Sequence, residues 1–128
     1  MPRRTAAPLP PMPRPTHRYP PPAAARPAWT DALEAYIEDN LARRITLDDL
    51  GAWIQRSASF VSQHFPRYFG ASPRRHVLLR RMERAKTLLQ QGALVREAAR
   101  QMGCYDAFHF SKVFRAHWGE PPSRFGPQ

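Results

Sequence analysis

Apolar residues recur at helical spacing along most of the chain after residue 28. Leu33, Ile37 and Leu41 follow one another at intervals of four residues and predict a first helix with one buried face. Similar series predict further helices that start near residues 46, 57, 73, 94 and 106. No segment alternates convincingly between polar and apolar residues, so the pattern predicts an all-α protein of about six to seven helices. The apolar side of the second helix is expected to consist of Leu47, Leu50, Trp53 and Ile54.

Side chains that cap helices stand at most of the predicted starts. Such a side chain accepts a hydrogen bond from an N–H group that the first turn leaves free. Asp49 follows Thr46 after three residues, which is a variant of the capping box. Ser72 precedes a proline, and proline suits the first position of a helix. The five expected caps are Thr30, Thr46, Ser57, Ser72 and Asp106.

Two stretches of the chain repeat one another. Residues 60–70 read FVSQHFPRYFG and residues 109–119 read HFSKVFRAHWG, and they share apolar, serine, aromatic and glycine positions at an offset of 49. The short helices before them correspond at an offset of 48, so the second turn is one residue longer. Gly51 thereby matches Ala99, and a small residue here lets two helices approach closely. Each copy predicts a helix-turn-helix, whose second helix enters the major groove of DNA. A generic helical hairpin is the alternative, which two related copies disfavour.

The repeat defines the expected domain organisation. We expect a disordered tail rich in proline and arginine over 1–28 and a DNA-binding domain over 29–128. Within that domain we expect a first helix-turn-helix over about 45–70, a linker helix over about 73–91 and a second helix-turn-helix over about 94–119. A linker helix of this length is roughly 28 Å long, and one turn of B-DNA is about 34 Å. The rod therefore permits two reading helices to lie in successive major grooves on one face of the duplex.

The basic charge is concentrated in the tail and in the repeats. The formal net charge is +10. Residues 29–49 hold two basic and six acidic residues, whereas residues 50–128 hold thirteen basic and four acidic ones. This balance indicates a polyanionic partner, although charge alone does not separate DNA from RNA or from an anionic membrane surface. The tail, which has five arginines and no acid, is either an inert leader or an arm that contacts phosphates without sequence preference.

Cysteine usage and hydropathy exclude several other classes. Cys104 is the single cysteine, so neither an intrachain disulfide nor a cysteine-based zinc site can form within one chain. No apolar run is long enough to span a membrane, and prolines interrupt any signal-peptide core. We therefore expect a cytoplasmic protein without membrane contact, with no cofactor, no metal and no catalytic residue. A methyl-accepting Cys104 is the enzymatic alternative, but no accompanying site is visible around it.

The folded region resembles the AraC/XylS family of transcription regulators. The stretches that carry the resemblance are ITLDDLGAW, SASFVSQHF, GASPRRHVLLRRMERAKTLL, VREAARQMGCYDAFHFSKVFR and GEPPSRF, within about residues 30–125. The resemblance implies two helix-turn-helix subdomains joined by a long helix. It also implies sequence-specific promoter binding at an asymmetric site and, often, contact with RNA polymerase. Members usually carry a further sensing or dimerisation domain, so this chain is expected to be a short stand-alone or truncated member, with a monomer favoured.

The chain departs from the family pattern at several positions. Pro66 stands where the family usually has a basic helical residue, Cys104 replaces an aromatic, and Pro121 replaces a serine. A proline inside a helix loses a backbone hydrogen bond, which costs about 3 kcal/mol in a regular interior. We therefore expect Pro66 to kink or shorten the third helix and to weaken the first unit.

Exposed positions near the start of each reading helix are the candidates for contacting bases, and they match the contact positions of the family. Glutamine can bond adenine, lysine can bond guanine, and apolar groups can meet the thymine methyl group. Later arginines suit phosphates. For Phe108 the alternative is packing into the core. The candidate base-reading residues are Ser59, Ser62, Gln63, Ala107, Phe108, His109 and Lys112. The candidate phosphate contacts are Arg67, Arg74 and Arg115.

The leading hypothesis is a regulator that binds double-stranded DNA with sequence specificity, with RNA polymerase as a further partner. One alternative is a basic nucleic-acid-binding protein without sequence preference, or a degenerate fragment of a larger regulator. Another is a protein-binding adaptor that uses the acidic first helix and the proline-rich tail. Salt dependence without sequence discrimination would favour the non-specific binder.

Overall fold

The computed structural model describes residues 26–104 and 106–126, and this part of the chain is helical without any strand. The tail that the sequence predicts to be disordered therefore lies almost wholly outside the described residues. The all-α class is confirmed. The elements are α1 (Ala28–Asp39), α2 (Leu47–Ile54), α3 (Ala58–Phe69), α4 (Pro73–Gln90), α5 (Val95–Gln101), α6 (Ala107–Trp118) and the 3-10 turn η2 (Pro122–Arg124).

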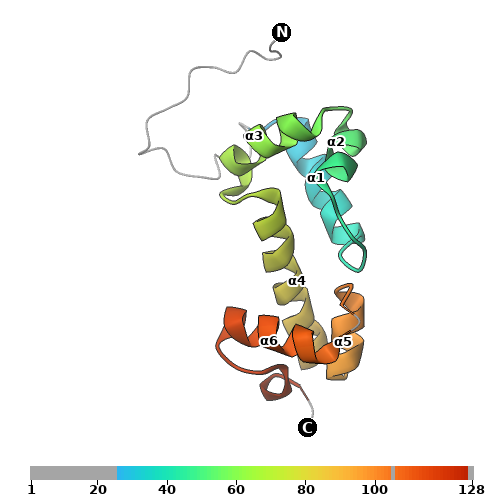
Figure 1. Cartoon of the computed structure of the whole chain (residues 1–128), viewed down its shortest axis with the longest axis vertical. Coiled ribbons are helices and arrows are strands. Elements are labelled where there is room, and N and C mark those ends of the chain that lie inside the picture. The colour runs from blue at the N-terminus through green and yellow to red at the C-terminus, as the bar shows by residue number, and fades with distance from the viewer. Residues whose placement is uncertain (1–25, 105, 127–128) are drawn as a thin grey trace.

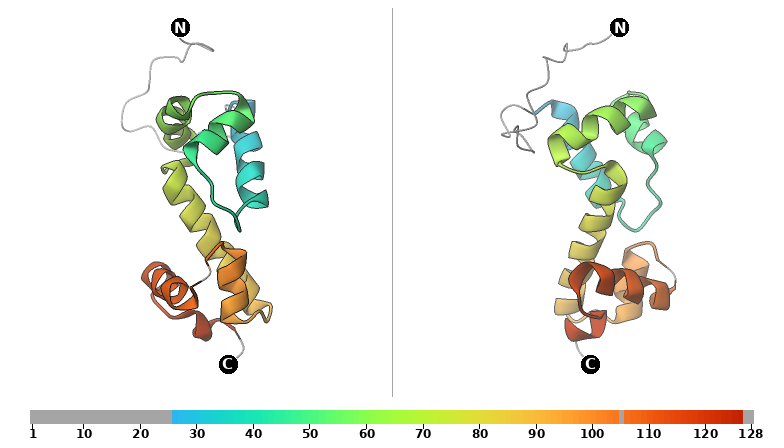
Figure 2. Two further views of the ribbon diagram at one scale, coloured as in Figure 1. Left: turned by 45° about the vertical axis from the view of Figure 1, so that its right-hand side comes forward. Right: turned by 60° about the vertical axis from the view of Figure 1, so that its left-hand side comes forward.

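The helices form two units at opposite ends of α4. Figure 1 shows α1, α2 and α3 grouped at one end of α4, and α5 and α6 at the other end. The two views of Figure 2 show the same separation, with η2 lying against α6 and the end of α4. Two helix-turn-helix units joined by a long helix are thus confirmed.

Most of the predicted caps are present. The Thr46 hydroxyl accepts a hydrogen bond from Asp49 N–H at 3.0 Å, and the Asp49 carboxylate accepts one from Thr46 N–H at 2.9 Å, which completes a capping box. Ser57 Oγ accepts from Phe60 N–H at 3.0 Å, and Ser72 Oγ accepts from Arg75 N–H at 3.2 Å. Side-chain chemistry that acts over three residues is local, which is why the sequence predicts these starts.

Thr30 is not a cap, and that prediction is wrong. The first helix begins at Ala28, and its N-cap position is Pro27, three residues before Thr30. Thr30 is fully buried inside the helix, where both its hydroxyl and its N–H group donate to the carbonyl of Pro27, at 2.7 and 3.0 Å. The hydroxyl therefore donates to a carbonyl from within the first turn. A capping hydroxyl would stand before the helix and accept a hydrogen bond from an N–H group.

The core follows one stripe of each helix. Phe65 on α3 and Phe110 and Phe114 on α6 are among its largest fully buried side chains. The predicted apolar side of α2 is too wide, because Trp53 is 58% exposed and Leu47 is 39% exposed. This helix has eight residues and buries only Leu50 and Gly51. The other buried core residues are Leu33, Ile37, Leu41, Val61, Val77, Met82, Ala85, Leu89, Ala98, Ala99 and Met102.

The turns of the two units share a backbone pattern. The N–H group of Arg56 donates to the carbonyl of Gly51 at 2.8 Å, and the N–H group of Cys104 donates to the carbonyl of Ala99 at 2.9 Å. A Cβ atom on Gly51 would lie 2.5 Å from the carbonyl oxygen of Arg56, so this position requires glycine. The close approach predicted for the small residue is therefore present in the first unit.

Pro66 does not shorten α3. The helix runs through the proline to Phe69 and has 12 residues, as α6 does. Both helices end on a left-handed glycine, Gly70 with φ 75° and Gly119 with φ 83°. Pro66 lies in the last turn, so its missing N–H group removes the helical hydrogen bond of only one carbonyl. The carbonyl of Pro66 itself still accepts a hydrogen bond from Gly70 N–H at 3.0 Å. The expected shortening is wrong for this reason.

Candidate nucleic-acid interface

The exposed face of α3 carries the first group of predicted base-reading residues. Ser59, Ser62 and Gln63 are all exposed. Positions three and four apart share one side of a helix, so these side chains form one short row near the start of α3. The opposite side of the helix carries the buried Val61 and Phe65. The row is polar and uncharged.

The matching face of α6 has a different chemistry. Phe108 is 73% exposed, so it does not pack into the core. His109 and Lys112 are exposed, and Ala107 is half-buried. The ammonium nitrogen of Lys112 lies 5.4 Å from the centroid of the Phe108 ring. A cation thus rests beside an aromatic face, and both groups are available to a ligand.

The repeat explains how the two helices differ. At the offset of 49, Phe60 occupies the place of His109. Phe60 is half-buried, with the Trp29 ring centroid at 5.6 Å and the His64 ring centroid at 4.3 Å from its own, and the Arg56 guanidinium lies over its ring at 4.9 Å. The start of α1 therefore covers a side of α3, whereas the corresponding histidine of α6 remains exposed. The two units therefore present different groups on their exposed helix faces.

Sequence reasoning omitted one position that the repeat could have supplied. Ser111 matches Ser62 at the offset of 49 and lies on α6 between Phe108 and Lys112. It is half-buried, whereas Ser62 is exposed. The correspondence between the two copies therefore adds Ser111 to the candidate residues of α6.

The three candidate phosphate contacts differ in accessibility. Arg74 is exposed in the first turn of α4, and Arg115 is exposed late in α6. Arg67 is half-buried, and one of its terminal guanidinium nitrogens is buried without a hydrogen-bond partner among the described residues. Arg74 and Arg115 are therefore better placed than Arg67 for a phosphate.

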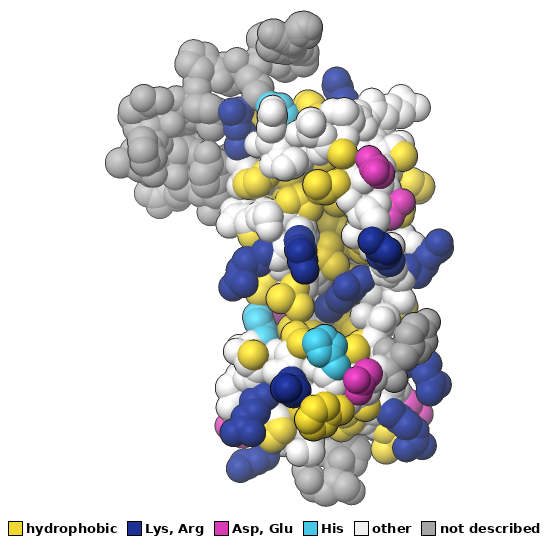
Figure 3. Space-filling model, in the orientation of Figure 1, with side chains coloured by type: hydrophobic (Ala, Val, Ile, Leu, Met, Phe, Trp, Pro, Cys, Tyr) yellow, Lys and Arg dark blue, Asp and Glu magenta, His cyan; other side chains and the backbone are white. Residues whose placement is uncertain are grey.

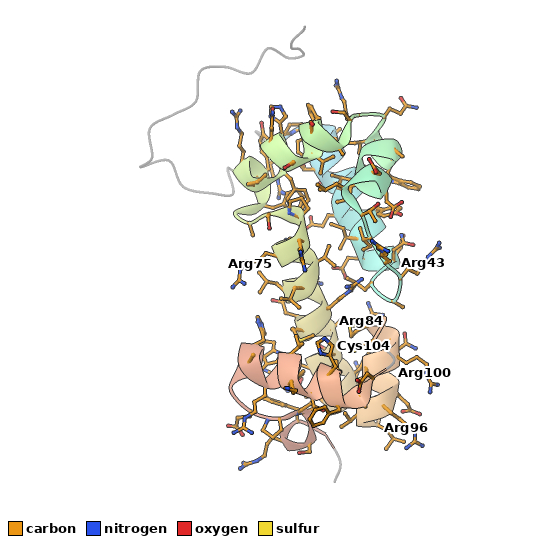
Figure 4. The ribbon with its side chains drawn as sticks, viewed as in Figure 1. Arg43, Arg75, Arg84, Arg96, Arg100 and Cys104 are labelled. Atoms are coloured by element: carbon orange, nitrogen blue, oxygen red, sulfur yellow. The ribbon has the colours of Figure 1, made fainter. Side chains whose placement is uncertain are left out.

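Basic side chains gather around the middle of the molecule. In Figure 3, dark blue groups cross the centre of the face shown, between the two units. The labelled arginines of Figure 4 come from the loop after α1, from α4 and from α5. Arg80 of α4 is not free to bind an anion, because it pairs with Glu38 of α1 and with Glu83. The hydrogen bond from Arg80 lowers the pKa of Glu38 and raises the pKa of Arg80.

The described residues offer little for other chemistry. No group of three or more histidine, cysteine or acidic side chains among them could hold a metal ion. The Cys104 thiol is half-buried and donates to the carbonyl of Asp106 at 3.4 Å. None of the helices described is long and apolar enough to cross a membrane.

Comparison with known proteins identifies the family. A helix-turn-helix domain family matches residues 53–127. The chain belongs to the AraC-type family of helix-turn-helix DNA-binding domains. A probable AraC family transcriptional regulator from Rhodopseudomonas palustris has 33% sequence identity and a TM-score of 0.63, and the match covers 76% of this chain and 93% of that one.

Two further relatives agree with this assignment. The C-terminal domain of the two-component response regulator yesN from Fusobacterium nucleatum is 28% identical with a TM-score of 0.69, and the match covers 75% of this chain and 95% of that domain. The uncharacterised HTH-type transcriptional regulator YidL from Escherichia coli is 36% identical over 94 residues, which are 73% of this chain and 32% of YidL. The chain thus spans about a third of the length of this curated relative.

Proposed function

We propose that this protein is a transcription regulator that binds double-stranded DNA with sequence specificity, and that α3 and α6 read two successive major-groove segments. The observation that carries the proposal is the matched pair of exposed helices, each begun by a capping side chain, at opposite ends of α4. With 18 residues, α4 is about 27 Å long at 1.5 Å per residue. That length suits successive grooves, which are about 34 Å apart along one face of B-DNA.

The exposed side chains suggest a division of labour. Lys112 is suited to the acceptor atoms of guanine, and Phe108 with Ala107 is suited to a thymine methyl group. Gln63 is suited to adenine, flanked by small hydroxyl groups. Arg74 and Arg115 would set the register by contacting phosphates. In this scheme the second unit contributes more of the charge and more of the sequence preference.

The parts beyond the two repeats have supporting roles in the proposal. Residues 1–28 would add phosphate contacts without sequence preference, since they hold five arginines and no acid. The acidic residues of α1 and α2 are unsuited to DNA, so contact with RNA polymerase or another protein would use that side. Action in the cytoplasm, as a monomer on an asymmetric site, completes the proposal.

The test is in vitro selection of duplexes from a random library at moderate salt, using the full chain. We expect an enriched motif of two different parts about one helical turn apart. Selections with Gln63→Ala and with Lys112→Ala should each relax one part and leave the other, which assigns each part to a helix. Retention of duplexes without any motif would replace this proposal with a non-specific binder, and a single part would mean that only one unit reads sequence.

A further inference from the structure

The loop between α1 and α2 is held by a single arginine of α4. We call residues 40–46 the bridging loop. Arg81 donates a hydrogen bond from Nε to the carbonyl of Leu41 at 2.9 Å and another from Nη2 to the carbonyl of Arg43 at 2.6 Å. A turn within the loop, in which Arg43 N–H donates to the Asn40 carbonyl at 2.9 Å, presents these carbonyls together. The first unit is thereby tied to the middle of the connecting helix.

The same loop reaches the turn of the second unit. Gly103 lies between α5 and α6 and has a φ of 74°. A Cβ atom built on it would lie 3.0 Å from the carbonyl oxygen of Ala42, so two backbones are in close contact there. Figures 1 and 2 show the tip of the bridging loop beside the top of α5 in every view. The carbonyls of residues 41 to 43 therefore face Arg81 and the second unit together.

An arginine side chain suits the position of Arg81, which bonds two carbonyls of the bridging loop. Its planar guanidinium presents several donors in a fixed fork, whereas the ammonium group of lysine is a compact point charge. Arg81 is half-buried, and burial lowers its pKa, while the neighbouring Cys104 of the second turn acts in the opposite direction. Arg84, three residues further along α4, is exposed. The two arginines thus differ in burial and contacts although they share one helix.

We propose that Arg81 is a positioning residue that fixes the orientation of the two reading helices relative to one another, and hence the separation of the two DNA segments that they prefer. The expected effect on DNA binding rests on the proposed function, whereas the fixed orientation of the two units does not. The length of α4 sets the distance between the units. Their relative rotation depends in addition on the contacts between the bridging loop, α4 and the second turn. Two linked binding modules lose effective concentration when their relative geometry becomes loose.

The first test needs no DNA. Residual dipolar couplings of backbone amides are measured in partially aligned samples of the wild type, Arg81→Met and Arg84→Met. Methionine keeps an aliphatic stem and removes the guanidinium, and Arg84→Met is the matched control. We expect one alignment tensor to fit both units in the wild type and the control, and tensors of different magnitude for the two units in Arg81→Met. A single tensor for Arg81→Met would overturn the proposal.

The second test uses selected duplexes in which the spacing between the two parts is native or changed by one or two base pairs. Relative to Arg84→Met, we expect Arg81→Met to bind the native spacing about tenfold more weakly, to bind an isolated half equally well, and to discriminate less between spacings. An equal loss on the isolated half would overturn the positioning role. Arg81→Lys, which keeps the charge without the fork, should fall between, and it serves in both tests if Arg81→Met fails to fold. A wild type without sequence preference would refute the proposed function while leaving the coupling result intact.

Discussion

Gly51 is the position at which one added methyl group should do most damage to the first unit. Its Cβ atom would meet only backbone, namely the Arg56 carbonyl oxygen at 2.5 Å and the Ser57 carbonyl carbon at 3.1 Å. No flexible side chain can move aside, so the turn itself must open and strain its hydrogen bond from Arg56 N–H. Because only backbone can move, overpacking here should cost about 3 kcal/mol, the upper end of its usual range, against a gain of about 1 kcal/mol when alanine replaces glycine in a helix. We expect Gly51→Ala to lower the free energy of unfolding by about 2 kcal/mol.

Thermal and urea unfolding followed by circular dichroism measure this loss. For a domain of about 100 residues, 2 kcal/mol corresponds to a fall in Tm of roughly 8–16 °C. The neighbouring exposed Ala52 provides the control, because Ala52→Gly should cost about 1 kcal/mol from helix propensity alone. The sign of the change in stability distinguishes the steric clash from helix propensity. If Gly51→Ala is neutral or stabilising while Ala52→Gly destabilises, propensity governs the site and the steric reasoning is refuted.

Three further predictions concern DNA affinity and pH. Lys112→Ala should weaken binding to the preferred site by about 1–3 kcal/mol and relax one base position, as measured by fluorescence anisotropy on single-base variants; a uniform loss on all sequences would make Lys112 a phosphate contact. Pro66→Lys restores a backbone donor in α3 and adds a positive charge, so affinity should rise severalfold in the same assay, and unchanged or weaker binding would show that the proline is no handicap. Burial against Phe65 and Phe69 lowers the pKa of His76 below its ordinary 6.5. The unfolded state therefore binds the proton more readily, and stability should fall as the pH drops through 6.5. Thermal unfolding at pH 7.5 and 5.5 should show a smaller fall in Tm for His76→Phe than for the wild type, and an identical fall would remove His76 from the explanation.

The features that the sequence predicts are those set by local chemistry and by the repeat. Thr46, Ser57, Ser72 and Asp106 act on N–H groups two or three residues away, so their residue types suffice to mark the helix starts. Spacing within α3 and α6 likewise separates the buried Phe65 and Phe114 from the exposed faces.

The features that the sequence does not predict depend on contacts between distant segments. Arg81 bonds carbonyls 38 and 40 residues away, and nothing in its neighbourhood along the chain distinguishes it from Arg80 or Arg84. Trp53 has the hydrophobicity of a core residue, but its ring lies at the surface against Tyr36, with the centroids 5.0 Å apart. The exposure of Phe108, in contrast, follows from the sequence, since helical spacing places it outside the stripe formed by Phe110 and Phe114.

Dimethyl sulfate interference on a selected duplex tests most directly whether two units read successive major grooves, because the reagent methylates guanine N7 in that groove. Duplexes are methylated sparsely, bound by the full chain, and separated into bound and free fractions. We expect the modified guanines that prevent binding to fall into two clusters with centres about 10 base pairs apart. A single cluster, or interference spread evenly along the duplex, would contradict binding of the two units in successive major grooves.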